Sequence, residues 1–448
     1  MFASCLLVPF LLGFSSTGEG GKDLDAERLP ALWIHGERII LRPGVELEDA
    51  AILIEKGIIV AIGPDVQAPE GARKIEGKTI CAGFIDPWSS LGLDPGSVQD
   101  QRTQPSTHTI DSLDTFGMPE LRQQALEAGV TSLRLQAGQA AQQNGLGILV
   151  RTNAGPDSEV LLQDACLSIT LSSVAGRRAD VFSRAASLSR VVGSIKEGEA
   201  YRLEQVEYRH ELAEWQKGID EATEKLTDDF KKAKKKRDKD KKSAEEKGKE
   251  FKDKKYKEDK PPREPKQDAD RAVMARVAEG ELPVVFEARD PAEIRSLLRE
   301  TADIERLRML ISGAEGAEAF AEELAKRKIP VLLWPSTEAP GPAGRADKDL
   351  TLAGKLERMG VPVLIGSGGQ TSSRDLRLLA AMAISHGLSP EAALNAITLG
   401  PAKAFDVSDR VGSLKRGLDA DILIFDGDPL DTTSKIQFVI SRGRVVAE

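Results

Sequence analysis

Residues 411–429 read VGSLKRGLDADILIFDGDP, in which a short apolar run ends at a Gly-Asp-Pro turn. The next stretch, IQFVISRGRVVAE at 436–448, also alternates apolar and polar residues, which is typical of strands. Similar runs lie at the other end of the chain, where ALWIHGERIIL, DAAILIEKGIIVAIG and RKIEGKTICAGFID occupy residues 31–86. Strand patterns at both ends enclose a long middle, which predicts one small β domain built from both termini.

The middle of the chain alternates short apolar strands with amphipathic helices. DPAEIRSLLRETA at 290–302 has helical spacing, and VPVLIGSG at 361–368 has the pattern of a buried strand. SPEAALNAITLGPAKAF at 389–405 opens with Ser-Pro-Glu, a favourable helix start. Repeated strand-then-helix units predict a parallel sheet, either open or closed into a barrel.

The bulk composition restricts the class of protein. The 448 residues suffice for one large and one smaller domain, and a net charge of −9 argues against nucleic-acid binding. Three cysteines show no zinc or disulfide spacing. The four histidines, His35, His108, His210 and His386, are widely separated, so we interpret them as non-ligands.

The amino terminus carries an apolar stretch from Phe2 to Phe14 followed by small residues. The stretch is too short to span a bilayer and is typical of a signal peptide over residues 1–20. We expect export to the periplasm or the extracellular space. A cytoplasmic location is the alternative, because no Lys or Arg precedes the apolar run.

A long charged segment interrupts the alternation at residues 199–270. Apolar residues at helical spacing over 201–230 predict a helix, and residues 231–260 carry sixteen basic and eight acidic side chains. One interpretation is a surface insertion without a partner. The other is an electrostatic tether to an acidic surface, although the arm could equally fold back on its own acidic body.

Two stretches, GKTICAGFIDPWSSLGLD at 77–94 and the segment from 360 to 429, resemble the amidohydrolase superfamily, especially its imidazolonepropionase-like branch. The resemblance implies an α/β fold in which a (β/α)8 TIM barrel is flanked by a β-sandwich domain. The expected domains are residues 25–80 plus 405–448 for the β-sandwich and 81–404 for the barrel, with 199–270 inserted. The family hydrolyses carbon–nitrogen bonds other than peptide bonds, using zinc or another divalent metal to activate water.

The ligand positions implied by the resemblance carry the wrong chemistry in this chain. The paired histidines after the first strand fall on Trp88 and Ser90, and those of the fifth and sixth strands fall on Glu287 and Gly313. The catalytic aspartate of the eighth strand falls on Gly368. Indole offers no lone pair to a metal, glycine has no side chain, and a serine hydroxyl is a poor ligand. We therefore expect no metal cofactor.

The remaining candidates follow from the same comparison. Arg151 is the candidate for the bridging-lysine position, although arginine forms no lysine carbamate. The expected pocket at the barrel mouth is lined by Trp88, Ser90, Arg151, Glu287, Ser312, Gly313, Ser367 and Gly368. Glu287, Asp86 and His108 are the candidate catalytic residues, since each could act as a base or ligand near the mouth.

Three functions follow from these observations. The first is a pseudoenzyme that acts as a non-catalytic binding or scaffold protein, with a small-molecule ligand in the barrel mouth. The second is an active hydrolase that uses Glu287, helped by His108 or Asp86. The third is a surface-association protein that binds an acidic partner through residues 231–260. Symmetric homo-oligomers are compatible with all three.

Overall fold

The computed structural model describes residues 29–137, 142–153, 155, 159–171, 181–246, 260–334, 349–369 and 372–448. The expected signal peptide at 1–20 lies outside the described residues. Within the described part of the chain, no helix combines the length and the apolar composition needed to span a bilayer.

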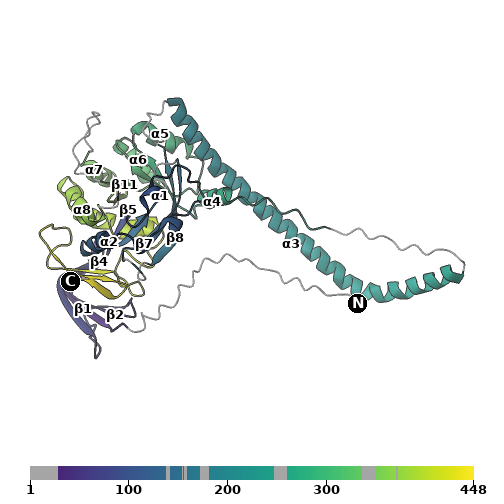
Figure 1. Cartoon of the computed structure of the whole chain (residues 1–448), viewed down its shortest axis with the longest axis horizontal. Coiled ribbons are helices and arrows are strands. Elements are labelled where there is room, and N and C mark those ends of the chain that lie inside the picture. The colour runs from purple at the N-terminus through teal and green to yellow at the C-terminus, as the bar shows by residue number, and fades with distance from the viewer. Residues whose placement is uncertain are drawn as a thin grey trace.

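Both ends of the chain contribute to one seven-stranded sheet, in the order β15-β14-β13-β4-β1-β2-β3 (Figure 1). Its strands are β1 (Leu32–Arg42), β2 (Val45–Glu55), β3 (Ile58–Gly63), β4 (Arg73–Ala82), β13 (Ile422–Phe425), β14 (Ile436–Ser441) and β15 (Arg444–Ala447). β4 pairs parallel with β1 and antiparallel with β13, so it joins the two ends of the chain. Ile34, Ile52, Ile80 and Ile424 are fully buried in the core of this sheet. The predicted composite β domain is confirmed.

A second sheet of eight strands forms the barrel, in the order β12-β11-β10-β9-β8-β7-β6-β5. Its strands are β5 (Phe84–Ser89), β6 (Val130–Leu135), β7 (Gln143–Arg151), β8 (Val160–Thr170), β9 (Val284–Ala288), β10 (Met309–Gly313), β11 (Val331–Leu333) and β12 (Val363–Ile365). A bridge between Ser89 and Gly369 brings the first and last strands together and nearly closes the barrel. The predicted TIM barrel is confirmed.

One strand of the barrel runs in the opposite direction. β7 is antiparallel to both β6 and β8, whereas every other pair in this sheet is parallel. The connections 136–142 and 152–159 are too short to hold a crossover helix, so the chain can only turn back on itself. A strictly parallel (β/α)8 barrel is therefore modified at this strand, and the carboxyl end of β7 lies at the amino end of its neighbours.

Helices cover the outside of the barrel (Figure 1). They are α1 (Pro95–Val98), α2 (Pro119–Glu127), α3 (Val181–Glu246), α4 (Ala269–Ala278), α5 (Pro291–Glu300), α6 (Ala321–Lys326), α7 (Leu352–Arg358), α8 (Leu376–Ser385), α9 (Pro390–Ala396) and α10 (Leu399–Ala404). The predicted start of α9 is confirmed, because the Ser389 side chain accepts from the Ala392 N–H at 3.2 Å and Pro390 occupies the first turn.

The helix α3 differs from the predicted insertion. It begins at Val181 and continues without interruption to Glu246, so the expected boundary at 199 falls inside a helix. Its first turns bury Leu188, Val191 and Ile195 against the barrel. Beyond them α3 leaves the body as a long arm (Figure 1). Residues 260–268 return beside it, and the backbone N of Asp268 lies 3.4 Å from the Tyr201 hydroxyl.

The barrel interior is filled by side chains. Six strands each contribute one buried aliphatic residue to this inner core: Ile85, Leu149, Val285, Leu310, Leu332 and Leu364. Polar and aromatic side chains follow these residues toward the carboxyl ends of the parallel strands. Any site of the barrel type is therefore confined to this end, which is where such barrels carry their chemistry.

Candidate functional site at the carboxyl ends of the barrel strands

Two tryptophans close the carboxyl end of the barrel. Trp88 lies in β5 and stacks on Trp334, which follows β11, with ring centroids 5.2 Å apart and an interplanar angle of 27°. A Cβ atom built on Gly313 would lie 3.6 Å from Trp334, and one on Gly368 would lie 3.5 Å from it. The aromatic pair thus occupies the space into which side chains at 313 and 368 would project.

A buried arginine lies beneath this pair. Arg134 of β6 has no exposed surface, and its guanidinium lies over the Trp88 ring at 5.3 Å and over the Phe405 ring at 5.7 Å. Both rings can stabilise a cation through their π faces. Alternation along VTSLRL places Arg134 on the inner face of β6, because its neighbours Leu133 and Leu135 pack in the outer core.

The polar contacts of Arg134 are all with neutral groups. Its Nη2 donates to Gln136 Oε1 at 2.8 Å and to the Ser168 hydroxyl, and its Nε lies 3.2 Å from Cys166 Sγ. Across the described residues, no carboxylate pairs with Arg134, and its Nη1 has no hydrogen-bond partner. The sequence analysis missed this residue. The signal that could have revealed it is a single charge inside an otherwise uncharged buried strand.

Asp86 joins the first and last strands of the barrel. Its Oδ1 accepts from the backbone N–H of Trp88 at 3.1 Å and of Ser367 at 3.0 Å. Its Oδ2 accepts from the hydroxyls of Ser367 at 2.5 Å and Ser373 at 2.9 Å. Burial raises the pKa of Asp86 to about 6, although these hydrogen bonds oppose the rise. Both carboxylate oxygens are engaged, so Asp86 acts as a bridge between β5 and β12.

Glu287 is the one acidic residue among the predicted ligand positions, and it is also engaged. It is nearly buried at the end of β9, where its Oε1 accepts from Arg289 Nε at 2.7 Å and its Oε2 accepts from the Thr170 hydroxyl at 3.1 Å. Ser312 lies beside it on β10, in register with Glu287. A carboxylate paired with a guanidinium offers few lone pairs to a metal or a substrate.

Most of the predicted pocket residues do gather at this end of the barrel. Trp88, Ser367 and Gly368 adjoin each other, since Gly368 N–H donates to the Trp88 carbonyl at 3.0 Å. Gly313 lies against Arg289, the partner of Glu287. Ser90 is buried just beyond β5. These residues form a packed cluster in which few atoms reach solvent.

Arg151 does not belong to this cluster, and its assignment to the pocket is wrong. Because β7 is reversed, Arg151 is in register with Ser132 at the amino end of β6. Its Nη2 contacts Asp419 at 2.6 Å, its Nε contacts Glu159 at 2.9 Å, and its Nη1 pairs with Asp421. Burial disfavours the charged form of Arg151, but the carboxylates outweigh burial and its pKa is raised.

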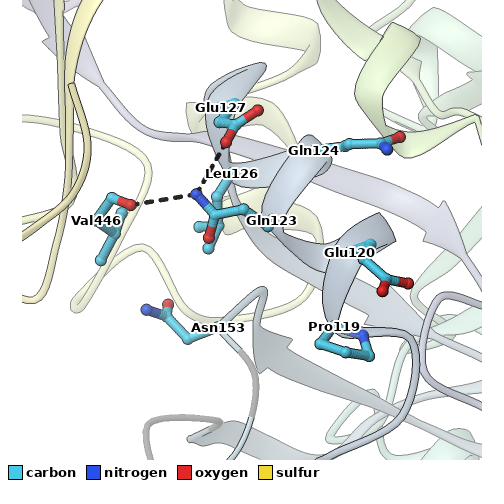
Figure 2. Close-up of a pocket in the computed structure, with 8 residues that line it drawn as sticks. All are labelled: Pro119, Glu120, Gln123, Gln124, Leu126, Glu127, Asn153 and Val446. Carbon is cyan, nitrogen blue, oxygen red and sulfur yellow. Dashed lines mark hydrogen bonds between the residues drawn. The ribbon is translucent and has the colours of Figure 1, made fainter.

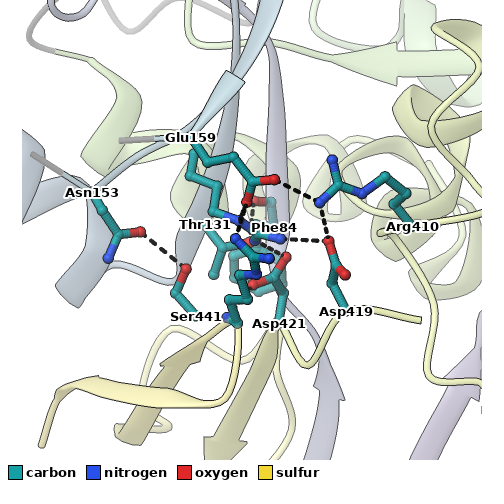
Figure 3. A network of polar contacts seen from close by, with 10 residues as sticks. Phe84, Thr131, Asn153, Glu159, Arg410, Asp419, Asp421 and Ser441 are labelled. Carbon is teal, nitrogen blue, oxygen red and sulfur yellow. Dashed lines mark hydrogen bonds and ion pairs between the residues drawn. The ribbon is translucent and has the colours of Figure 1, made fainter. Parts of the chain in front are cut away.

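Two further arginines complete this network, which Figure 3 shows from close by. Arg410 Nη2 lies 2.8 Å from Glu159 and 2.7 Å from Asp419. Arg442 Nη1 lies 3.1 Å from Glu159, and its backbone N–H donates to Asp421 at 2.8 Å. The network therefore connects β7 to the segment around β13 and β14, and it fastens the terminal sheet to the amino end of the barrel.

His108 is also placed away from the cluster. Its Nδ1 lies 3.2 Å from Asp164 of β8, which accepts from Arg276 of α4 at 2.7 Å. Because α4 covers the outside of the barrel, this pair lies on the helix-covered side of β8. The expectation that His108 joins Glu287 at the barrel mouth is wrong, since a loop that follows a strand can also pack along the outer wall.

The residues at the expected metal position do not fit a divalent ion. Within the described residues, no three His, Cys, Asp or Glu side chains form a group that could hold a metal. The nearest donors are Glu287, which is paired with Arg289, and Asp86, which is fully hydrogen-bonded. The buried guanidinium of Arg134 would also repel a second positive charge in this low-dielectric space. We derive no catalytic step through a metal.

A separate groove lies outside the barrel, between α2 and the end of the terminal sheet (Figure 2). It encloses about 790 Å³ and is lined by Pro119, Glu120, Gln123, Gln124, Leu126, Glu127, Asn153 and Val446. Gln123 Nε2 donates to Glu127 at 3.1 Å and lies 3.4 Å from the Val446 carbonyl. The groove is open, and two of its other polar groups are engaged by residues around it, since Gln124 accepts from Arg374 and Asn153 accepts from Ser441, each at 2.9 Å.

Comparison with known proteins agrees with this architecture. Residues 295–447 match the family model described as Amidohydrolase family. The amidohydrolase tasK of Hapsidospora irregularis is 35% identical over 69 residues, which cover 15% of this chain and 7% of that protein. An adenine deaminase of Rubrobacter xylanophilus is 41% identical over 66 residues, which cover 15% and 11%. The matches thus span only a small part of either relative.

Solved structures resemble nearly the whole chain. An amidohydrolase from Thermotoga maritima superposes with a TM-score of 0.69 at 19% identity, covering 93% of this chain and 99% of that one. The ochratoxinase of A. niger gives 0.52 at 12% identity, covering 93% and 95%. The barrel and the composite sheet define a protein with the amidohydrolase fold. Residues 295–447 are thus similar to the amidohydrolase family, and the chain shares the fold of its solved members.

Proposed function

We propose that this chain is a non-catalytic member of the superfamily, in which metal-dependent hydrolysis has been replaced by a binding or scaffold role. The observation that carries the proposal is the fully buried Arg134 under Trp88, with no acidic partner among the described residues. A cation at this point opposes a metal, whereas a hydrolase requires one there to activate water.

The aromatic pair supports the same proposal. Trp88 takes the place of one metal-binding histidine, and the ring of Trp334 fills the space beside Gly313 and Gly368. The residues at 88, 313 and 368 thus act together: they supply no metal ligand, and the tryptophan rings fill the space between them. Within the superfamily, we propose descent from the imidazolonepropionase-like branch on the strength of residues 411–429.

Metal content tests the proposal. The full chain would be purified without chelators and assayed by plasma mass spectrometry, before and after incubation with zinc or manganese and gel filtration. We expect far less than one equivalent of metal per chain and a circular dichroism spectrum that added metal leaves unchanged. One or two retained equivalents would overturn the proposal.

A matched variant separates the alternative of an active hydrolase that uses Glu287. If the wild-type chain retains metal and the Glu287→Ala variant does not, the chain has a metal site at β9 that uses Glu287. Glu300→Ala is the control, because this glutamate ends α5 on the surface, where it pairs with its neighbour Arg299. Equal metal content in the two variants would exclude Glu287 as a ligand.

A further inference from the structure

The projecting part of α3 carries an apolar stripe. Leu212, Trp215, Ile219, Ala222, Leu226, Phe230 and Ala233 follow one another in steps of three or four residues. Such spacing keeps one side of a helix apolar and is typical of helices that pair with another helix. Ile219 is 37% exposed, whereas Tyr201, nearer the barrel, is buried. The stripe therefore becomes more open along the arm, beyond the part that residues 260–268 accompany (Figure 1).

The stripe is nearly symmetric about its centre, between Ala222 and the next residue. If two copies of the arm lie antiparallel about this point, Trp215 faces Phe230 of the other copy, and Ile219 faces Leu226. Leu212 faces Ala233 in the same way. Apart from Ala222, whose counterpart is Thr223, each apolar residue on one side of the centre then has an apolar counterpart, as a two-fold symmetric helix pair requires.

The charges beside the stripe are divided between its two halves. Residues 204–221 contain six acidic and two basic side chains, and residues 231–242 contain nine basic and two acidic ones. In an antiparallel pair, the residues that precede stripe positions on both helices share one edge of the contact. Continued in the same helical steps beyond the stripe, this edge carries Glu204, Glu207, Glu211 and Glu214 on the proximal half and Asp229, Lys232, Lys236 and Lys239 on the distal half. Opposite charges therefore meet at three places along this edge, where Glu204, Glu207 and Glu211 face lysines, and like charges meet at one, where Glu214 faces Asp229.

Within one chain, the acidic residues of 204–221 cannot form ion pairs with the basic residues of 231–242. Both halves belong to the same uninterrupted helix from Val181 to Glu246, so the tip cannot turn back onto residues 204–221. A parallel pair would set acid against acid and base against base. An antiparallel second copy combines the apolar register with opposite charges at most positions of this edge.

We propose that two copies of this chain associate through α3, as an antiparallel helix pair centred between residues 222 and 223. The inference is independent of whether the barrel is catalytic. It assigns the partner of the basic arm to the acidic half of a second copy, which differs from an external acidic surface. Because Glu204, Glu207, Glu211 and Lys239 are exposed, the association weakens as salt screens these charges.

Sedimentation equilibrium and light scattering of the full chain test this proposal. At low salt we expect a dimer whose dissociation increases with salt. The variants Glu207→Lys/Glu211→Lys and Lys232→Glu/Lys236→Glu should each be monomeric, because like charges then meet. An equimolar mixture of these two variants should recover the dimer, since each supplies the charge that the other lost.

A control of equal charge change is Glu224→Lys/Asp228→Lys, which alters the face of α3 away from the stripe. This variant should remain dimeric, and circular dichroism should show the same helix content in all four proteins. A wild-type monomer at every concentration and salt would overturn the proposal, as would failure of the mixture to pair. Retention of a monomeric wild-type chain on heparin, lost in the Lys232→Glu/Lys236→Glu variant, would assign the arm to an external polyanion.

Discussion

The indole rings of Trp88 and Trp334 stack across β12, the strand that lies between their own strands β5 and β11. This contact is possible because β12 is followed by glycines. A Cβ on Gly366 would lie 2.8 Å from the Cβ of Trp88, and one on Gly368 would approach Trp334. The absence of side chains at Gly366 and Gly368 and the stacking of the two tryptophans therefore depend on each other.

An aspartate at Gly368, where the resemblance places the catalytic aspartate, should destabilise the protein. Gly368 has φ +83, which a residue with a Cβ adopts only under strain of about 1–2 kcal/mol, and the carboxylate would point at Trp334. We expect Gly368→Asp to cost more free energy of unfolding than Gly368→Ala, measured by urea denaturation. Gly417→Ala is the control, since Gly417 has φ +91 and open space around it. Equal costs in all three variants would refute the role of Trp334.

Asp86 should make the stability of the protein depend on pH. Its pKa is raised to about 6 by burial, above its value in an unfolded chain, so its ionised form is disfavoured in the folded state. This group therefore stabilises the fold most fully below pH 4, and the contribution of about 3 kcal/mol is lost as pH rises through 6. Asp86→Asn should remove this dependence in denaturation curves between pH 4 and 7. An unchanged pH profile in the variant would contradict the assignment.

Arg151 should be essential for joining the barrel to the terminal sheet. Arg151→Met leaves Asp419 and Asp421 buried without their main partner, which typically costs about 3–5 kcal/mol. Arg308→Met removes an exposed pair with Asp406 and should cost less than about 1 kcal/mol. Thermal unfolding of both variants provides the comparison. Similar melting temperatures would show that the network in Figure 3 contributes little to stability.

The sequence predicted the barrel and the composite sheet because strand and helix patterns depend on local spacing. The cap at Ser389 could be predicted for the same reason. The direction of β7 could not be predicted, because an apolar run such as GILV has the same pattern whichever way the strand runs. This reversal is also why Arg151 was misplaced, since in a parallel strand it would have reached the barrel mouth.

The candidate site was predicted in part. The substitutions at Trp88, Gly313 and Gly368 could be found by resemblance, whereas their packing around Trp334 depends on strands distant in sequence. Arg134 was overlooked because a strand pattern indicates burial but does not identify the partners of a charge. Export through residues 1–20 stays a prediction, and the loss of hydrolysis stays a proposal.

The position of β4 between β1 and β13 affects folding during translation as well as the stability of the terminal sheet. Thr79 and Cys81 pair with Phe425 and Leu423, so the first sheet to be translated cannot be completed until the last few dozen residues have left the ribosome. Contacts between such distant segments form slowly. One flank of β4 therefore stays unpaired while the barrel is being synthesised, and this edge is where the nascent chain is most exposed to misassembly.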